Sequence, residues 1–252
     1  MFIRTLIIVV LLLAMPAHAT RLALVIGNAD YSQVPKLRTP VSDAAAMAGE
    51  LTAAGFTVQL HRDLHYRGMV QAVETFTAGI KGGDEVVVFF SGHGVQIESD
   101  AYLVPIDMWA ETEADVRRGA YGLSVLSGKL RDANAAFSLV IVDAGRSNPF
   151  AASTSNRGAK SSVKSLNTHS GQLVMYSGDH GQDALDAIGQ DDPSPHGVFT
   201  RVLLKEMRRP GVSVDKMFQS VRAEVAELAR SVSHEQVPVM YGRLGVDFFF
   251  TK

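Results

Sequence analysis

The chain has 252 residues, of which 46% are hydrophobic and 20% are charged, a composition that can build one large domain with a substantial core. Its formal net charge of -2 argues against nucleic acid or an anionic membrane as the main partner. The chain contains no cysteine, which excludes disulfides, lipid attachment through a thiol and thiol chemistry.

Residues 1–19 have the pattern of a secretory signal peptide. Arg4 supplies the positive start, an apolar stretch follows, and Ala17 and Ala19 form the small-residue pattern that signal peptidase reads. A retained membrane anchor is the alternative, but the apolar stretch is shorter than the roughly 20 residues that a bilayer requires. We therefore expect cleavage before Thr20, no stable membrane anchor, and a periplasmic or secreted protein.

Short apolar runs alternate with segments of helical periodicity in the first part of the chain. Residues 21–28, 56–60 and 85–94 are predicted strands, and the apolar spacing over 44–51 and 70–80 predicts the helices between them. Crossovers of this kind give a mainly parallel sheet with helices on both faces. The sequence therefore predicts an α/β fold for residues 20–252.

The second half of the chain continues with further strands and helices. Predicted strands lie at 137–142, 173–177 and 245–250, a brief extended piece lies at 102–105, and predicted helices lie at 123–133, 198–208 and 214–231. Residues 108–120 are charged and predicted to be irregular. Residues 151–171 are rich in serine, threonine and lysine, which predicts a mobile surface loop within the domain.

The run at 85–94, EVVVFFSGHG, ends in a histidine between two glycines. A buried parallel strand places His93 just past its carboxyl end, the edge at which open α/β sheets bind ligands. Gly92 and Gly94 let the backbone approach a ligand closely, and Gly94 can offer an uncovered N–H. The alternative is a histidine whose hydrogen bonds are satisfied in a turn. A second strand tip, DAGRSNPF at 143–150, is expected beside the first.

Five motifs in this order resemble those of the bacterial caspase-like peptidases, relatives of caspases and metacaspases. They are LALVIGN, SGHG, YLVPID, DA-x-R-x-NPF and GVDFFF, and together they span residues 21–250. Caspase-type chains place the histidine about 50 residues before the nucleophilic cysteine, and here position 145 follows His93 by 52 residues. The resemblance implies a caspase-like three-layer fold, with a mainly parallel sheet of about six strands flanked by helices.

The resemblance also implies roles for individual residues. His93 would be the catalytic base and position 145 the nucleophile, but this chain has Gly145 there. The amides of Gly94 and Gly145 would stabilise an oxyanion, and Asp143 would shape a pocket for a basic side chain. We expect no metal or cofactor: Asp191 and Asp192 could hold calcium, as in some related metacaspases, but a solvated loop is the favoured interpretation. The resulting hypothesis is an exported pseudopeptidase that binds a peptide or protein through a basic residue, or that regulates active relatives.

Two other hypotheses stay open. In the first, the chain cleaves peptides after arginine or lysine through Ser91, Ser147 or Ser177, or is a nucleophile-less variant of an active cysteine peptidase. A serine two positions from the nucleophile points elsewhere on the turn, and a misplacement of 1 Å costs about a hundredfold in rate. In the second, the protein is a structural interaction domain whose cleft is vestigial.

Overall fold

The computed structural model describes residues 19–146 and 171–251. The predicted signal peptide, except for Ala19, and the predicted mobile loop, except for Gly171, therefore lie outside the described residues, as does Ser147. Within the described ranges, no helix has the length and apolar character needed to span a bilayer.

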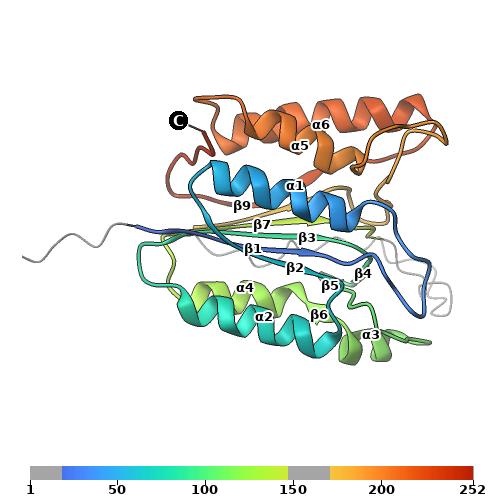
Figure 1. Cartoon of the computed structure of the whole chain (residues 1–252), viewed down its shortest axis with the longest axis horizontal. Coiled ribbons are helices and arrows are strands. Elements are labelled where there is room, and N and C mark those ends of the chain that lie inside the picture. The colour runs from blue at the N-terminus through green and yellow to red at the C-terminus, as the bar shows by residue number, and fades with distance from the viewer. Residues whose placement is uncertain (1–18, 147–170, 252) are drawn as a thin grey trace, which may run out of the picture.

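A six-stranded sheet forms the middle layer of the fold (Figure 1). Its strand order is β2-β1-β3-β7-β8-β9; the first five strands run parallel and β9 is antiparallel to β8. The strands are β1 (Arg21–Gly27), β2 (Thr57–Arg62), β3 (Glu85–Ser91), β7 (Phe137–Asp143), β8 (Gln172–Tyr176) and β9 (Val239–Arg243). The predicted α/β class and its mainly parallel sheet of about six strands are confirmed.

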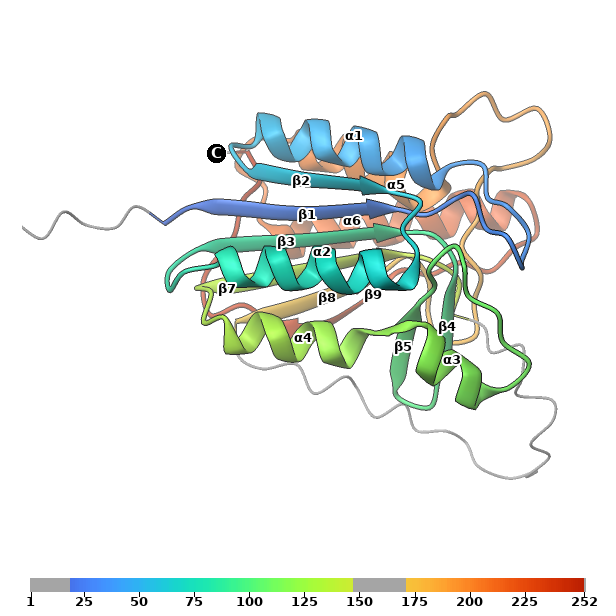
Figure 2. The same cartoon turned by 60° about the horizontal axis from the view of Figure 1, so that its bottom comes forward.

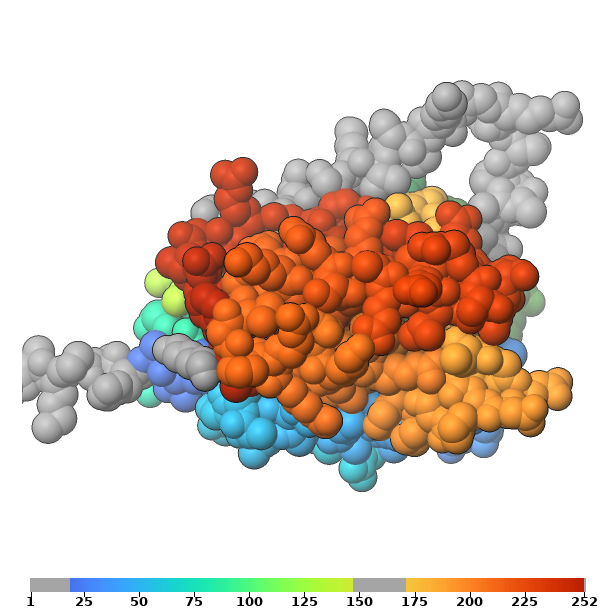
Figure 3. Space-filling view, turned by 90° about the horizontal axis from the view of Figure 1, so that it is seen from above, coloured from blue at the N-terminus to red at the C-terminus, as the bar shows by residue number. Residues whose placement is uncertain are grey.

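Helices cover both faces of this sheet. The helices α1 (Pro40–Ala53), α5 (Val198–Met207) and α6 (Val214–Ser231) lie on one face, and α2 (Tyr66–Gly79) and α4 (Leu123–Asp132) lie on the other (Figures 1 and 2). In Figure 3, the residues of α5 and α6 lie side by side across the first face. Central strands are apolar at nearly every position because each side of the sheet is covered.

Successive residues of β3 show how one strand serves two cores. Phe89 packs in the cluster that contains residues of α1, α5 and α6, whereas Phe90 packs in the cluster that contains residues of α2 and α4. Side chains of a strand alternate between the two faces of a sheet, so an unbroken apolar run is required here. This requirement explains why β3 was readable from sequence.

A small antiparallel sheet follows the carboxyl end of β3 (Figure 2). It consists of β4 (Gly94–Ile97), β5 (Asp100–Leu103) and β6 (Tyr121–Gly122), and α3 (Glu113–Gly119) precedes β6. The extended piece predicted at 102–105 corresponds to β5. The prediction of an irregular segment at 108–120 is wrong for α3, because Thr112 and Asp115 form a reciprocal capping box that starts the helix and Val116 is buried.

The prediction of a last strand at 245–250 is also wrong, since the last strand in the described part of the chain is β9. Phe248 and Phe250 are buried instead in an aromatic cluster at the amino-terminal edge of the sheet. The ring of Phe248 lies 4.5 Å from that of Phe137 and 4.9 Å from that of Phe250. The guanidinium of Arg21 donates to the carbonyl groups of Phe249 and Phe250. Burial of rings, rather than ladder pairing, therefore accounts for this apolar run.

Replacing Phe248 with alanine is expected to destabilise the fold by about 3–5 kcal/mol, the usual cost of removing a buried aromatic ring. Phe249 is only partly buried, so Phe249→Ala is the matched control and is expected to cost about 1 kcal/mol. Urea unfolding of the two variants measures the difference. Equal losses would show that the aromatic cluster does not anchor the C-terminal segment.

Candidate functional site

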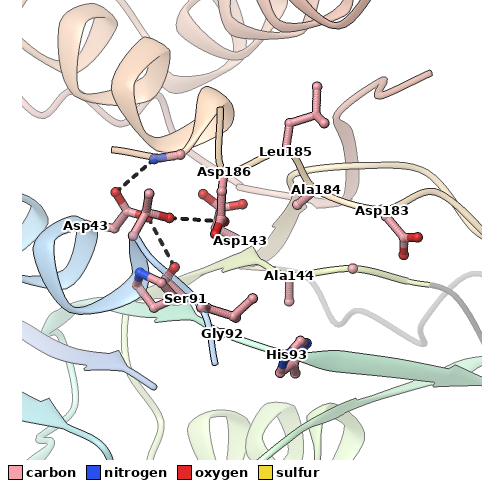
Figure 4. Close-up of a pocket in the computed structure, with 15 residues that line it drawn as sticks. Asp43, Ser91, Gly92, His93, Asp143, Ala144, Asp183, Ala184, Leu185 and Asp186 are labelled. Carbon is pink, nitrogen blue, oxygen red and sulfur yellow. Dashed lines mark hydrogen bonds between the residues drawn. The ribbon is translucent and has the colours of Figure 1, made fainter. Parts of the chain in front are cut away.

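The tips of β3 and β7 meet at one edge of the sheet. The two strands are parallel neighbours, and Ser91 stands opposite Asp143 in their register. His93 and Gly145 each follow two residues later, and both line a cavity of about 300 Å³ (Figure 4). The predicted placement of His93 and Gly145 at the same edge is therefore confirmed.

His93 is held by contacts on both its backbone and its ring. Its backbone N–H donates to the hydroxyl of Tyr31 at 2.8 Å, and the two rings meet edge to face with centroids 4.5 Å apart. Nε2 of His93 lies 2.8 Å from the carbonyl oxygen of Pro35. A carbonyl only accepts hydrogen bonds, so Nε2 carries the proton and Nδ1 of the neutral ring is the basic nitrogen. This tautomer suits a general base that acts through Nδ1.

Gly94 permits an unusually close approach between the two strand tips. A Cβ atom on Gly94 would lie 2.7 Å from the carbonyl oxygen of Gly145 and 3.0 Å from Cβ of Ala144. The carbonyl of His93 accepts from the N–H of Val104, so the alternation of an antiparallel pair turns the Gly94 N–H away from β5. The oxyanion role of Gly94 and Gly145 stays a prediction, but their backbones are adjacent.

Position 145 can accept a side chain without rearrangement of its backbone. Gly145 does not have the positive φ that favours glycine. A Cβ atom built on it would meet Oδ1 of Asp183 at 2.9 Å, while the nearest other atoms are 3.8 Å away or more. The carboxylate of Asp183 is exposed and ends a rotatable side chain. Among the residues that the structure describes, only this group would have to move.

The serines proposed as substitute nucleophiles are engaged elsewhere. Ser91 is buried and donates to Oδ2 of Asp43 at 3.3 Å. Ser177 is fully buried, where its hydroxyl accepts from the N–H of Ala144 and donates to the Ala144 carbonyl. These hydrogen bonds join neighbouring segments and leave neither hydroxyl free to attack a substrate.

Two buried carboxylates lie deep in the cavity. Asp143, predicted to shape a basic-residue pocket, is 7% exposed and accepts a 2.6 Å hydrogen bond from the Thr200 hydroxyl. Asp43 of α1 is 1% exposed and accepts from the N–H of Gly197 at 3.2 Å. Both line the cavity together with Asp186. Three carboxylates from α1, β7 and the loop after β8 therefore converge there (Figure 4).

Sequence reasoning missed Asp43 and Asp186. The helix predicted from the apolar spacing over 44–51 begins earlier, at Pro40 with Thr39 as its N-cap, and so includes Asp43. Asp43 precedes Met47 by four residues and so shares the buried face of the helix. A carboxylate on an apolar helix face is a detectable signal. Asp186 lay in a polar loop with several other acids, where nothing distinguished it.

Burial raises the pKa of both Asp43 and Asp143, each to about 7. Desolvation is the main cause, and for Asp143 the nearby charge of Asp43 adds to it. His196 lies 3.1 Å from Asp43, but desolvation lowers the pKa of the His196 ring and favours its neutral form. Within the described ranges, 19–146 and 171–251, no lysine or arginine forms an ion pair with either carboxylate. When these two carboxyl groups ionise, the cavity therefore gains negative charge that no lysine or arginine of the described residues balances.

Comparison with known proteins places these features in a family. The family model described as "Caspase domain" matches residues 20–249. Over 92 residues, 36% of this chain, the chain is 30% identical to mucosa-associated lymphoid tissue lymphoma translocation protein 1 of Homo sapiens and to its homolog in Mus musculus. The matched stretch covers 11% of the length of each relative. Because the family model matches nearly the whole chain, this chain belongs to the caspase domain family.

Proposed function

We propose that the protein is an exported pseudopeptidase that binds a peptide or protein through a basic side chain. The observation that carries the proposal is the pair of buried carboxylates, Asp43 and Asp143, in a cavity that also holds His93 and lacks a nucleophile at Gly145. A family member with this combination keeps the parts that recognise a ligand and has lost the part that attacks it.

The missing nucleophile argues against peptide hydrolysis. In cysteine peptidases a thiolate attacks the scissile carbonyl and the histidine transfers a proton to the leaving amine. Gly145 has no side chain to attack with, and the hydroxyls of Ser91 and Ser177 are held in structural hydrogen bonds. His93 thus has a basic nitrogen with no nucleophile to serve among the described residues.

The charge of the cavity supports a cationic ligand. Attraction between opposite charges is several times stronger in a partly buried site than in water. A guanidinium or ammonium group would pair with Asp43 and Asp143 and lower their raised pKa values, so that binding would release protons. A cavity of about 300 Å³ suits one long side chain rather than a whole peptide. Arginine or lysine is the residue type that fits this description.

The location and the partner are also part of the proposal. The signal-peptide pattern of residues 1–19 supports export, and hence a periplasmic or secreted protein that meets other exported peptides or proteins. Regulation of active relatives is consistent with such a role, because an inactive cleft can compete for the same ligands.

An active endopeptidase is the second candidate, with this chain as its nucleophile-less variant. It is favoured by two observations: Nε2 of His93 lies against the carbonyl oxygen of Pro35, and position 145 has room for a side chain. Both features are those of a site prepared for catalysis. Activity of the protein after restoration of a thiol, treated in the Discussion, tests this candidate.

Binding of N-acetyl-arginine methylamide to the wild-type protein, measured by isothermal titration calorimetry, tests the pocket. We expect the uncharged isostere N-acetyl-citrulline methylamide to bind at least about tenfold more weakly, since it lacks the charge for which the carboxylates are placed. Affinity for the arginine compound should rise from pH 5.5 to pH 8, because both carboxyl groups ionise near pH 7. Equal affinity for the two compounds would contradict the proposal.

A further inference from the structure

We propose that Arg146 is a positioning residue that fixes the strap, defined as residues 144–146, against the hairpin of β4 and β5. This inference rests on the proposed function, since the alignment of Gly94 with Gly145 matters only if a ligand's peptide backbone meets their amides. Arg146 does not line the cavity. Its effect on the site would pass through the segments that it connects.

The guanidinium of Arg146 is almost fully buried, with 3% of the residue exposed. Nε and Nη2 both donate to Oε1 of Gln96, at 3.1 and 2.9 Å, and Nη1 donates to the carbonyl of Gly178 at 3.3 Å. The guanidinium carbon lies 4.0 Å from the ring centre of Tyr176. Its acidic neighbour, Asp179, is 3.9 Å away and half exposed. The side chain is therefore held mainly by neutral acceptors and an aromatic face.

Burial of a charge under these conditions is costly, and an apolar residue of similar volume is often equally stable. Stability alone therefore gives no reason for an arginine at position 146. An apolar residue cannot supply the several N–H donors of a guanidinium, which join Gln96 and Gly178 in a fixed geometry. These contacts indicate that Arg146 is needed to hold the two segments at a fixed distance and orientation.

Gln96 transmits this geometry to Gly94. Its Nε2 donates to the carbonyl groups of Glu98 and Asp100 in the turn of the hairpin, which leaves Oε1 facing Arg146. Gln96 and Gly94 are two residues apart on β4, so they lie on the same face of the strand. A bond from Arg146 to Gln96 consequently holds the hairpin where Gly94 packs against Gly145.

The backbone of Arg146 holds a third segment. Its N–H donates to the carbonyl of Gln182 at 2.8 Å, and its carbonyl accepts from the N–H of Gly181 at 3.1 Å. The loop that contains Gln182 continues into Asp183 and Asp186, which line the cavity. Arg146 thus contacts the hairpin and this loop from the strap itself.

The carboxylate pocket is anchored independently of Arg146. Asp43 is bonded to Gly197 and Asp143 to Thr200, at the start of α5. Loss of the Arg146 side chain should therefore leave recognition of a basic side chain intact while the strap and the hairpin lose their alignment. This separation provides a specific readout.

The experiment compares two ligands by NMR titration. Propylguanidine carries only the arginine side-chain group, whereas N-acetyl-arginine methylamide adds peptide groups that would contact the strap and the hairpin. Arg146→Met keeps much of the side-chain volume but removes every side-chain donor, while the backbone N–H stays in place. We expect its affinity for propylguanidine to stay within twofold of wild type and its affinity for the peptide compound to fall about tenfold.

Further variants test the route of the effect. Gln96→Leu should reproduce the selective loss, and the double variant should be no worse than either single one if both act through one contact. Arg146→Lys, which can donate to Gln96 but not to Gly178 at the same time, should recover part of the affinity for the peptide compound. Arg222→Met removes an exposed arginine of the same length and should change neither affinity.

The outcomes distinguish the two proposals. Equal loss of both affinities in Arg146→Met would mean that the residue only stabilises the fold, and would overturn the inference. If neither ligand binds the wild type, the proposed function fails. The positioning role of Arg146 is then tested separately, by amide hydrogen exchange. Faster exchange at residues 94–97 and 144–146 of Arg146→Met, with unchanged exchange in α1 and α5, would support a positioning role. Unchanged exchange at the strap and hairpin would overturn it.

Discussion

The Gly145→Cys variant is expected to cleave peptides after arginine or lysine, while the wild-type protein shows no cleavage above buffer. The new thiol would stand in the cavity that holds His93, whose basic nitrogen is Nδ1. A thiol is partly ionised at neutral pH, so a base within reach makes it an effective nucleophile. We expect a rate at least about a hundredfold above the background rate in buffer, measured with fluorogenic substrates.

Asp183 should limit the activity of this variant. Its carboxylate oxygen lies 2.9 Å from the position of the new Cβ, and a negative charge beside a thiol raises the thiol pKa. Adding Asp183→Asn keeps the shape of the side chain and removes its charge. The double variant should therefore be alkylated by iodoacetamide with a lower apparent pKa and should cleave faster than Gly145→Cys alone.

Two controls accompany the thiol variant. Gly145→Cys with His93→Ala should be inactive, and Gly145→Ala should bind the arginine compound without cleaving it. Wild-type activity that survives His93→Ala would contradict the family mechanism for this protein. Wild-type activity that depends on both His93 and Ser147 would establish the serine hypothesis instead.

Asp143→Asn is expected to make the protein more stable at pH 8 and to have little effect on stability near pH 4. Asp143 has a usual pKa of 3.8 that burial raises to about 7 in the folded protein. Its contribution to stability is present below pH 3.8 and is lost as the pH rises through about 7, because the folded state must then hold a buried charge. Asparagine avoids that charge. We expect a gain on the order of 2–4 kcal/mol at pH 8, measured by urea unfolding.

The same substitution should weaken binding of the arginine compound by about a hundredfold at pH 8, since a buried charge-assisted hydrogen bond is lost. Asp192→Asn is the control with the opposite sign. Hydrogen bonds from the N–H groups of Ile188 and Ser194 lower the pKa of Asp192. Its replacement should therefore destabilise the protein at neutral pH, and the difference should shrink on acidification. A gain in binding by Asp143→Asn would contradict the pocket assignment.

The five parallel strands of the sheet and the two strand tips were readable from sequence because local pattern determines them, whereas the antiparallel β9 was not predicted. A strand such as β3, covered on both sides, must be apolar throughout, and the polar residues that end it mark the sheet edge. The position of Gly145 followed from the motif spacing. These features depend on neighbours in the sequence.

The carboxylate pocket could not be read in the same way. Asp43 lines the same cavity as Asp143 only because α1 packs on β1 and β3, which brings together residues 100 positions apart in the sequence. The aromatic cluster around Phe248 depends likewise on Phe137, far earlier in the chain. Local periodicity contains no information about which distant segments become neighbours, so such contacts needed the three-dimensional structure.

The backbone at Gly145 bears on how this lineage can change. Because its φ is not positive and, among the described residues, a Cβ meets only a movable carboxylate, a cysteine can enter without a coordinated change in the described backbone around it. Glycine codons of the GGC or GGT type become cysteine codons through one base substitution. If the protein is inactive because of Gly145, one mutation could then restore the nucleophile. No intermediate variant that fails to fold would be needed.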